Sequence, residues 1–345
     1  MKSLRSAVML ISFCIILVFL SIPFMKVRDV AAAEVELSSA AIWPANHVMY
    51  KSLVDEWGAE IEKRTNGRVK IIGYPTGTLL TGKEIYEGVV NNIADIGVSV
   101  FAYTRGRFPL MEGTDLPFGY GSGLVATRVA NDIYRKYKPK EASDTHVCFL
   151  HAHGPGIIST KKPVRSLDDI SGMKIRCSGL AAKIVKKLGA VPVAMPQAAT
   201  YEALQKGVVE GTASPVMVLE TWKYWELVKY VVLNYSSSYT SSFYVVMNLK
   251  KWNSLPEDIQ KVITEVSEEW IERQGKLWDR VDESAFSLLK EKGVEVIKQS
   301  PEESTRWAKA VEPLINEYVR DKSAKGLPAA EFIADIKELV KKYRK

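Results

Sequence analysis

The stretch GMKIRCSGLAAKIVKKLG, residues 172–189, contains the signals of a strand, a turn and a helix in succession. A short apolar run, 173–177, predicts the strand, and the small residues Ser178 and Gly179 follow it. Apolar side chains then recur at helical spacing, at Leu180, Ile184, Val185 and Leu188. Gly189 ends the predicted helix, as glycine commonly does. This succession predicts an α/β fold.

The same alternation extends toward the N-terminus. Strands are predicted at 35–41, 69–74, 96–100 and 147–153, and helical stretches separate them. Such alternation is typical of α/β proteins and excludes a β-sandwich or a helix bundle. A chain of 345 residues has room for about two domains, each with its own core. We therefore expect two α/β lobes.

The C-terminal third is predicted to be helical. Apolar residues keep a helical stripe for about 30 residues from Ile259 to Leu288, which is longer than one small lobe requires. We expect this helix to brace both lobes, with further helices at 307–319 and 332–340. A glycine-rich turn, 154–156, is the expected hinge. The expected boundaries are lobe I at 34–153 plus about 240–279, and lobe II at 154–239 plus about 280–345.

The first 33 residues resemble a secretory signal. Lys2 and Arg5 precede an uncharged apolar run, 7–24, and small residues follow at Ala31, Ala32 and Ala33. We expect cleavage after Ala33 and a periplasmic mature protein; an uncleaved N-terminal anchor is the alternative. Two cysteines then remain, Cys148 and Cys177, which fit either one disulfide or two thiols.

The formal charge of +7 belongs partly to this segment. Cleavage removes four basic residues and one acidic residue, which lowers the charge to +4. The other Lys and Arg residues are scattered among acids and form no basic stripe with aromatic spacers. The sequence therefore does not predict nucleic acid binding.

Arg176 is the strongest candidate for a binding residue. It stands near the end of a short apolar strand, and open α/β sheets bind ligands at strand ends. Its planar guanidinium suits a carboxylate, although a structural ion pair is the alternative. A rival hypothesis is an exported metal-dependent enzyme using His146, His151 and His153.

Several motifs together resemble one family. They are GMKIR at 172–176, LGAVPVAMP at 188–196, YEALQKGVVEG at 201–211, LPEDIQK at 255–261 and GRVKIIGYP at 67–75. The chain resembles the dicarboxylate-receptor (DctP-like) solute-binding proteins of tripartite ATP-independent periplasmic (TRAP) transporters. The resemblance implies a two-lobed periplasmic-binding-protein-like fold and capture of a small organic acid for a TRAP permease. It also implies a monomer without cofactor or enzymatic activity; a receptor of an ATP-driven importer or a sensor system is the alternative.

The resemblance also implies site residues. Arg176 takes the position of the family's carboxylate-binding arginine, and Ser214 that of a polar residue near the ligand. Related sialic-acid-binding members carry a second arginine where this chain has Gly156. Either His153 or backbone amides of the glycine-rich turn then assist Arg176, or the space admits a larger ligand. Topology adds six ring-bearing residues to the expected lining: Trp43, His47, Phe101, Tyr103, Tyr239 and Phe243. Each aromatic residue among them has a place in the core as its alternative.

Overall fold

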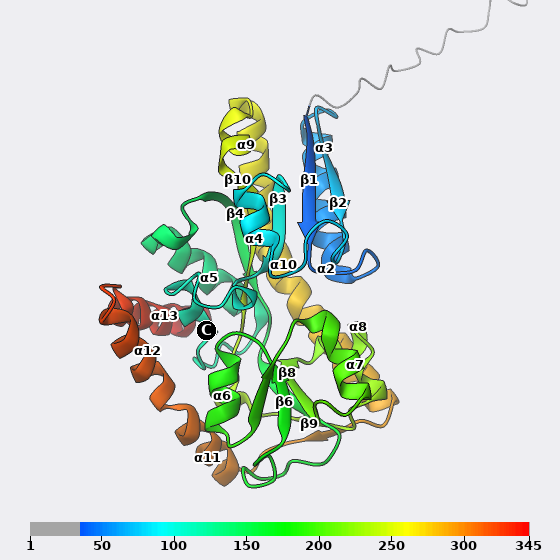
Figure 1. Ribbon diagram of the computed structural model, residues 1–345, viewed down its shortest axis with the longest axis vertical. Helices are drawn as coiled ribbons and strands as arrows, with labels where there is room; N and C mark the ends of the chain where they lie inside the picture. The colour runs from blue at the N-terminus through cyan, green and yellow to red at the C-terminus, as the bar shows by residue number, and fades with distance from the viewer. Residues whose placement is uncertain (1–34, 345) are drawn as a thin grey trace, which may run out of the picture. The chain divides into compact units, whose positions relative to one another are not determined.

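The computed structural model describes residues 35–344, so the expected signal segment lies outside the described residues. Two β-sheets appear in Figure 1 as separate groups of arrows. The first sheet has the order β2-β1-β3-β10-β4. Its strands are β1 (Val35–Ala41), β2 (Val69–Tyr74), β3 (Ile96–Val100), β4 (Thr145–Ala152) and β10 (Ser242–Asn248).

Helical crossovers make the first three strands parallel. α3 (Trp57–Arg64) connects β1 to β2, and α4 (Ile85–Val90) connects β2 to β3, because parallel neighbours need a long connection. β10 enters between β3 and β4 and runs antiparallel to both. The bounds of β1, β2 and β3 are those expected from the sequence.

The second sheet has the order β11-β9-β5-β8-β6-β7. Its strands are β5 (Gly156–Thr160), β6 (Lys174–Cys177), β7 (Val191–Ala194), β8 (Gly211–Pro215), β9 (Tyr230–Val232) and β11 (Glu295–Ile297). β6 is parallel to β7 and β8, and α6 (Ala181–Lys187) makes the crossover from β6 to β7. The stretch 172–189 therefore forms the predicted strand–turn–helix unit, and Arg176 lies one residue before the end of its strand.

The chain passes between the sheets three times: from β4 to β5, from β9 back to β10, and from β10 to β11 through residues 249–294. The first two connections are called the crossing segments. The two crossing segments are joined, because the Gly156 backbone N–H donates a hydrogen bond of 2.7 Å to the Tyr239 carbonyl. At Gly154 a Cβ atom would lie only 2.5 Å from Asp282 Oδ2. A side chain at this crossing, where the sequence predicts the hinge, would therefore have to displace the Asp282 carboxylate.

α10 (Glu257–Glu291) packs against elements of both sheets (Figure 1). It contacts α5 (Gly123–Tyr137) and β4 on one side and α8 (Met217–Thr221) on the other. Two of its carboxylates fix these neighbours. Asp279 accepts a 2.6 Å hydrogen bond from the Gly123 N–H, and Asp282 accepts one of 3.1 Å from the Met217 N–H. The expected brace across both lobes is confirmed.

The remaining α-helices are α2 (Val48–Tyr50), α7 (Thr200–Gln205), α9 (Leu249–Ser254), α11 (Pro301–Val311), α12 (Pro313–Ser323) and α13 (Ala329–Tyr343). The prediction of one helix over 307–319 is wrong. Pro313 begins a new helix there, because proline fits a first turn but not a helix interior. α13 packs against α5 of the first sheet, so the predicted lobe boundaries, which place 280–345 in lobe II, stay a prediction.

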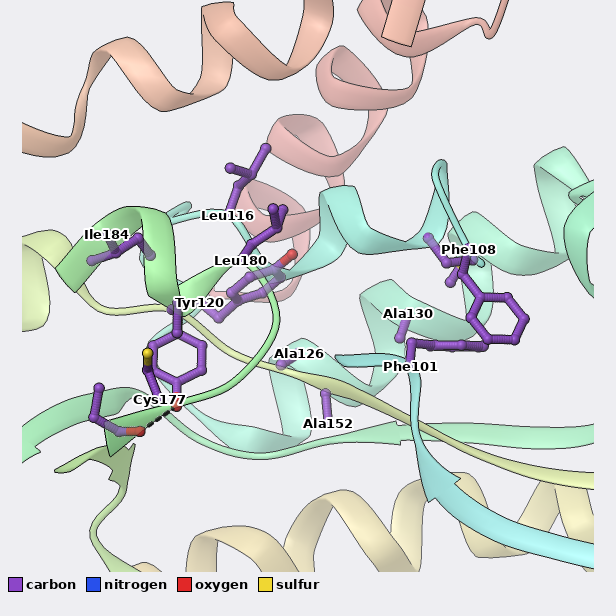
Figure 2. Packing of buried hydrophobic residues seen from close by; sticks show 14 of the residues in the cluster. Phe101, Phe108, Leu116, Tyr120, Ala126, Ala130, Ala152, Cys177, Leu180 and Ile184 are labelled. Carbon is purple, nitrogen blue, oxygen red and sulfur yellow. Dashed lines mark hydrogen bonds between the residues drawn. The ribbon is translucent and has the colours of Figure 1, made fainter. Parts of the chain in front are cut away.

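Buried apolar side chains from both sheets and α10 form the core. Figure 2 shows part of it, including Phe101, Phe108 and Cys177. Cys148 and Cys177 are both free thiols in the structure. Over residues 35–344, no helix combines the length and the apolarity needed to cross a membrane.

Candidate functional site

A pocket of about 480 Å³, its mouth included, receives side chains from both sheets. The first sheet and the turns at its strand ends contribute Ile42, Trp43, Val100, Tyr103, Ser241 and Phe243. The second sheet and its loops contribute Arg176, Ser178, Gln197, Pro215, Met217, Val218 and Trp222. His153 and Tyr239 come from the crossing segments, and Trp278 comes from α10. Arg176 is the only Lys, Arg, Asp or Glu among the described lining residues.

The Arg176 guanidinium is buried, with 2 % of the residue exposed, and each of its three nitrogens donates a hydrogen bond to the protein. Nε and Nη2 donate to the Met195 carbonyl at 3.1 and 2.8 Å, and Nη1 donates to Ser214 Oγ at 3.3 Å. A guanidinium has five N–H groups, so two remain without a partner. Arg176 forms no ion pair with any carboxylate of the described chain. Arg176 is therefore a fixed, buried cation that lines the pocket and has two free N–H groups.

Ser214 accepts a hydrogen bond from the Arg176 guanidinium. It is buried on β8, next to β6, and its hydroxyl contacts both Arg176 Nη1 and, at 2.6 Å, Thr212 Oγ1. Ser214 is absent from the described lining of the pocket. The structure thus places it on the guanidinium, where it orients Arg176; a direct ligand contact by Ser214 stays a prediction.

His153 lies next to the Arg176 charge at the pocket wall. Its Nδ1 is 2.5 Å from the Gly154 carbonyl oxygen. The pKa of His153 is lowered to about 4, chiefly by burial and also by the Arg176 charge, against the opposing effect of the Gly154 hydrogen bond. His153 is therefore neutral at neutral pH in the unliganded protein and does not supply a second positive charge there.

The ring of Tyr239 explains the glycine at position 156. A Cβ atom on Gly156 would lie 2.2 Å from Cε1 of this ring. The Tyr239 hydroxyl donates a 2.8 Å hydrogen bond to the Ala213 carbonyl, which holds the ring in place. An aromatic face therefore occupies the space into which a side chain at position 156 would extend.

Rings from distant parts of the chain form the apolar wall. Trp43 and Phe243 lie 5.5 Å apart between ring centroids, and Phe243 and Trp278 lie 5.3 Å apart. Tyr103 connects the two sheets, because its hydroxyl accepts a 2.9 Å hydrogen bond from the Gln197 N–H. The pocket thus combines one cation, a neutral imidazole and several aromatic faces.

Residues 39–322 match the model of the bacterial extracellular solute-binding proteins, family 7. The chain belongs to this family. A TRAP periplasmic solute-binding protein from Desulfovibrio salexigens, solved as an open complex, is 38% identical and superposes with a TM-score of 0.80, covering 90% of this chain and 97% of that one. These matches favour the TRAP type over a receptor of an ATP-driven importer.

Two other relatives of this solute-binding protein differ in ligand. A marine metagenome TRAP solute-binding protein specific for aromatic acids was solved with 3-hydroxybenzoate; it is 29% identical, with a TM-score of 0.86, and the match covers 91% of this chain and all of that one. The C4-dicarboxylate-binding periplasmic protein of Rhodobacter capsulatus is 28% identical over 288 residues, which is 80% of this chain and 82% of that protein. Family membership alone therefore leaves the ligand open.

Two predicted lining residues of this solute-binding protein lie outside the pocket. Phe101 packs into the core against Phe108 (Figure 2), with ring centroids 4.6 Å apart, and against Tyr244, at 5.1 Å. It opens a 3-10 turn, Phe101–Tyr103, which turns Phe101 inward and Tyr103 toward the pocket. His47 instead caps α2, since its Nδ1 accepts the Met49 N–H at 3.1 Å.

Other lining residues were not predicted from the sequence. Trp278 lies on α10, about 100 residues from Arg176, and no local motif marks it as a pocket residue. Trp222 belongs to a conspicuous aromatic stretch, WKYWELVKY at 222–230, which is the signal that could have identified it. Gln197 follows the LGAVPVAMP motif directly.

His151 and His153 both pack against Phe243 and Trp278, whereas the third histidine of the metal hypothesis, His146, contacts a different ring. His146 stacks on Trp252 at 3.5 Å, whereas His151 stacks on Phe243 at 4.9 Å. Among residues 35–344, no group of three or more His, Cys, Asp or Glu side chains has the spacing to hold a metal ion. Nothing in the described geometry thus supports the metal-enzyme alternative.

Proposed function

We propose that this TRAP-type solute-binding protein binds a small organic monocarboxylate with a flat apolar body, and that Arg176 holds the carboxylate. The observation that carries the proposal is a buried guanidinium with two free N–H groups and no acidic partner in the described chain. A buried charge without a counter-charge is unfavourable by several kcal/mol. A ligand carboxylate would compensate it with two parallel, charge-assisted hydrogen bonds.

The lining supports one carboxylate rather than two. Arg176 is the only cationic side chain of the described lining, and a second ligand carboxylate would meet aromatic faces or the neutral His153. Flat rings of Trp43, Phe243 and Trp278 favour a planar apolar body. The marine relative is specific for aromatic acids, whereas the Rhodobacter capsulatus relative is named as C4-dicarboxylate-binding. Of these two ligand classes, the aromatic acids agree better with a monocarboxylate that has a flat apolar body.

Capture proceeds by closure of the two lobes, without a covalent step or a cofactor. A ligand that contacts residues of both sheets stabilises the closed form, which then docks on the membrane permease. The hydrogen bond from Gln197 to Tyr103 joins the lobes directly. In the cell, the mature protein works as a periplasmic monomer after cleavage behind Ala33.

The substitution Arg176→Ala tests the proposal. We expect it to weaken carboxylate binding by about 2 to 5 kcal/mol, the range for truncating one partner of a buried charge pair. Ligands come from a thermal-shift screen of aromatic, hydroxy, keto and dicarboxylic acids, since a ligand of the native state raises the melting temperature. Calorimetry then measures the affinity.

Lys174→Ala is the matched control, because Lys174 is an exposed cation on the same strand. It should bind like the wild type. Unchanged affinity in Arg176→Ala, or a screen in which amines and neutral sugars bind and no carboxylate does, would refute the proposal.

A further inference from the structure

We propose that His153 offers the ligand a hydrogen-bond acceptor, so that the pocket selects carboxylates with a hydroxyl group next to the carboxylate, the 2-hydroxy acids. The inference rests on the proposed function, because Arg176 must hold the carboxylate for the hydroxyl to lie beside it. It narrows the proposed ligands from monocarboxylates with an apolar body to 2-hydroxy acids.

The tautomer of His153 follows from one contact. A carbonyl oxygen can only accept, so the Nδ1 atom 2.5 Å from the Gly154 oxygen must carry the hydrogen. In the neutral ring the lone pair then resides on Nε2. Nε2 has no hydrogen-bond partner among the described residues, although the side chain lines the pocket.

Two neighbouring histidines have the opposite arrangement. Nδ1 of His47 accepts from the Met49 N–H, and Nδ1 of His151 accepts from Trp278 Nε1–H at 3.0 Å. In both neutral rings the hydrogen therefore lies on Nε2, and neither residue belongs to the described lining. Of these three buried rings, His153 alone brings an acceptor nitrogen to the pocket.

The surroundings keep His153 neutral. The ionisable groups that face it are Arg176 on β6, His151 on β4, Tyr239 on the crossing segment and Asp282 on α10 behind Gly154. Arg176 opposes a second positive charge, and no carboxylate is hydrogen-bonded to the ring. Asp282 accepts a hydrogen bond from the Met217 N–H, and the groups that shift the pKa of His153 do not include Asp282.

The ring is also held in position. Its backbone carbonyl accepts a 2.5 Å hydrogen bond from Thr240 Oγ1, and the Tyr239 ring stands at 89° to it, 5.3 Å away. The Gly154 backbone, whose carbonyl orients the imidazole, packs closely on Asp282, since a Cβ atom there would lie 2.5 Å from Asp282 Oδ2. A site prepared in this way loses a buried hydrogen bond when the ligand lacks the donor.

Matched acids that differ by one hydroxyl test the inference. The probes are mandelate against phenylacetate, and 3-phenyllactate against 3-phenylpropanoate, measured by calorimetry at pH 7.5. We expect the wild type to bind each hydroxy acid at least about tenfold more tightly than its partner, the scale of one buried hydrogen bond. His153→Phe, which keeps a ring and removes the acceptor, should bind both members of a pair equally. His153→Gln, which retains an acceptor oxygen, should keep part of the preference.

The outcomes separate the two proposals. Equal affinities in the wild type, or a hydroxyl preference that survives in folded His153→Phe, would overturn the role of His153 while leaving Arg176 as the carboxylate site. Tight binding of other carboxylates but none of these four acids would also overturn it. Failure of every carboxylate in the screen would refute the proposed function itself. An affinity for phenylacetate that rises tenfold per unit of falling pH between 8 and 6 would show that His153 acts as a cation instead.

Discussion

The two sheets contribute different chemistry to the same pocket. The second sheet brings Arg176, fixed by the Met195 carbonyl and Ser214, together with the polar side chains of Ser178 and Gln197. The first sheet brings no charge but the rings of Trp43, Tyr103 and Phe243. Under the proposed function, one lobe would hold the carboxylate and the other the body of the ligand, so that full affinity would require closure of both.

The junction between the sheets is where the largest change in stability is expected. Gly156→Ala would put a methyl group into the Tyr239 ring and should lower the free energy of unfolding by about 2 to 3 kcal/mol. Chemical denaturation measures the change. In the double variant Gly156→Ala/Tyr239→Leu the two effects should not add, because the smaller side chain leaves room for the methyl group. Strict additivity would show that the ring and Gly156 are not coupled.

Phe243 and Phe101 test the contrast between pocket wall and core. Phe243→Leu should weaken binding of an aromatic acid by about 1 to 2 kcal/mol, since it removes one face of the wall. Phe101→Leu should lower stability by a similar amount and leave affinity unchanged, because Phe101 packs on Phe108 and Tyr244. Calorimetry and thermal unfolding of both variants make the comparison. Loss of affinity in Phe101→Leu would show that this residue reaches the ligand after all.

Asp282 adds a pH dependence at the joint between the sheets. Burial raises its pKa to about 7, with a smaller contribution from Asp279, and the hydrogen bond from the Met217 N–H opposes the shift. The folded protein thus retains a proton that the unfolded chain releases near pH 4, so stability falls as pH rises from about 4 to 7 and levels off above 7. Between pH 6 and 8 the loss should be about 1 kcal/mol.

Asp282→Asn should remove this part of the pH dependence while its amide oxygen still accepts the Met217 N–H. Denaturation at pH 6, 7 and 8 compares the two proteins. Identical pH profiles would mean that Asp282 titrates alike in the folded and unfolded states.

Much of the fold was predictable because hydrophobic periodicity is a local signal. The strands β1, β2 and β3 and the long helix α10 lie where the pattern predicts them. Pro313 shows a signal that was present but not used, since it divides the predicted helix at 307–319. The lobe boundaries depend on tertiary packing such as that of α13 on α5, which periodicity does not encode.

Two signals predicted lining residues: a motif marked Arg176, and the expected topology indicated Trp43, Tyr103, Tyr239 and Phe243, all of which line the described pocket. Arg176 was identified at its strand end, and the structure places it in the pocket with its free N–H groups. Phe101, expected in the lining from topology, lies outside the described pocket because the 3-10 turn after β3 directs its ring into the core. The absence of an arginine at Gly156 was visible in the sequence, but its partner Tyr239 was not, because the two meet only across the crossing segments.

The central claim is that the pocket recognises a carboxylate through Arg176. Its most direct test compares the tightest-binding acid with its own amide by calorimetry on the wild type, since the two have nearly the same shape and differ in charge. We predict that the amide binds at least about 100-fold more weakly, because it cannot neutralise the buried guanidinium. Equal affinity for acid and amide would contradict the account.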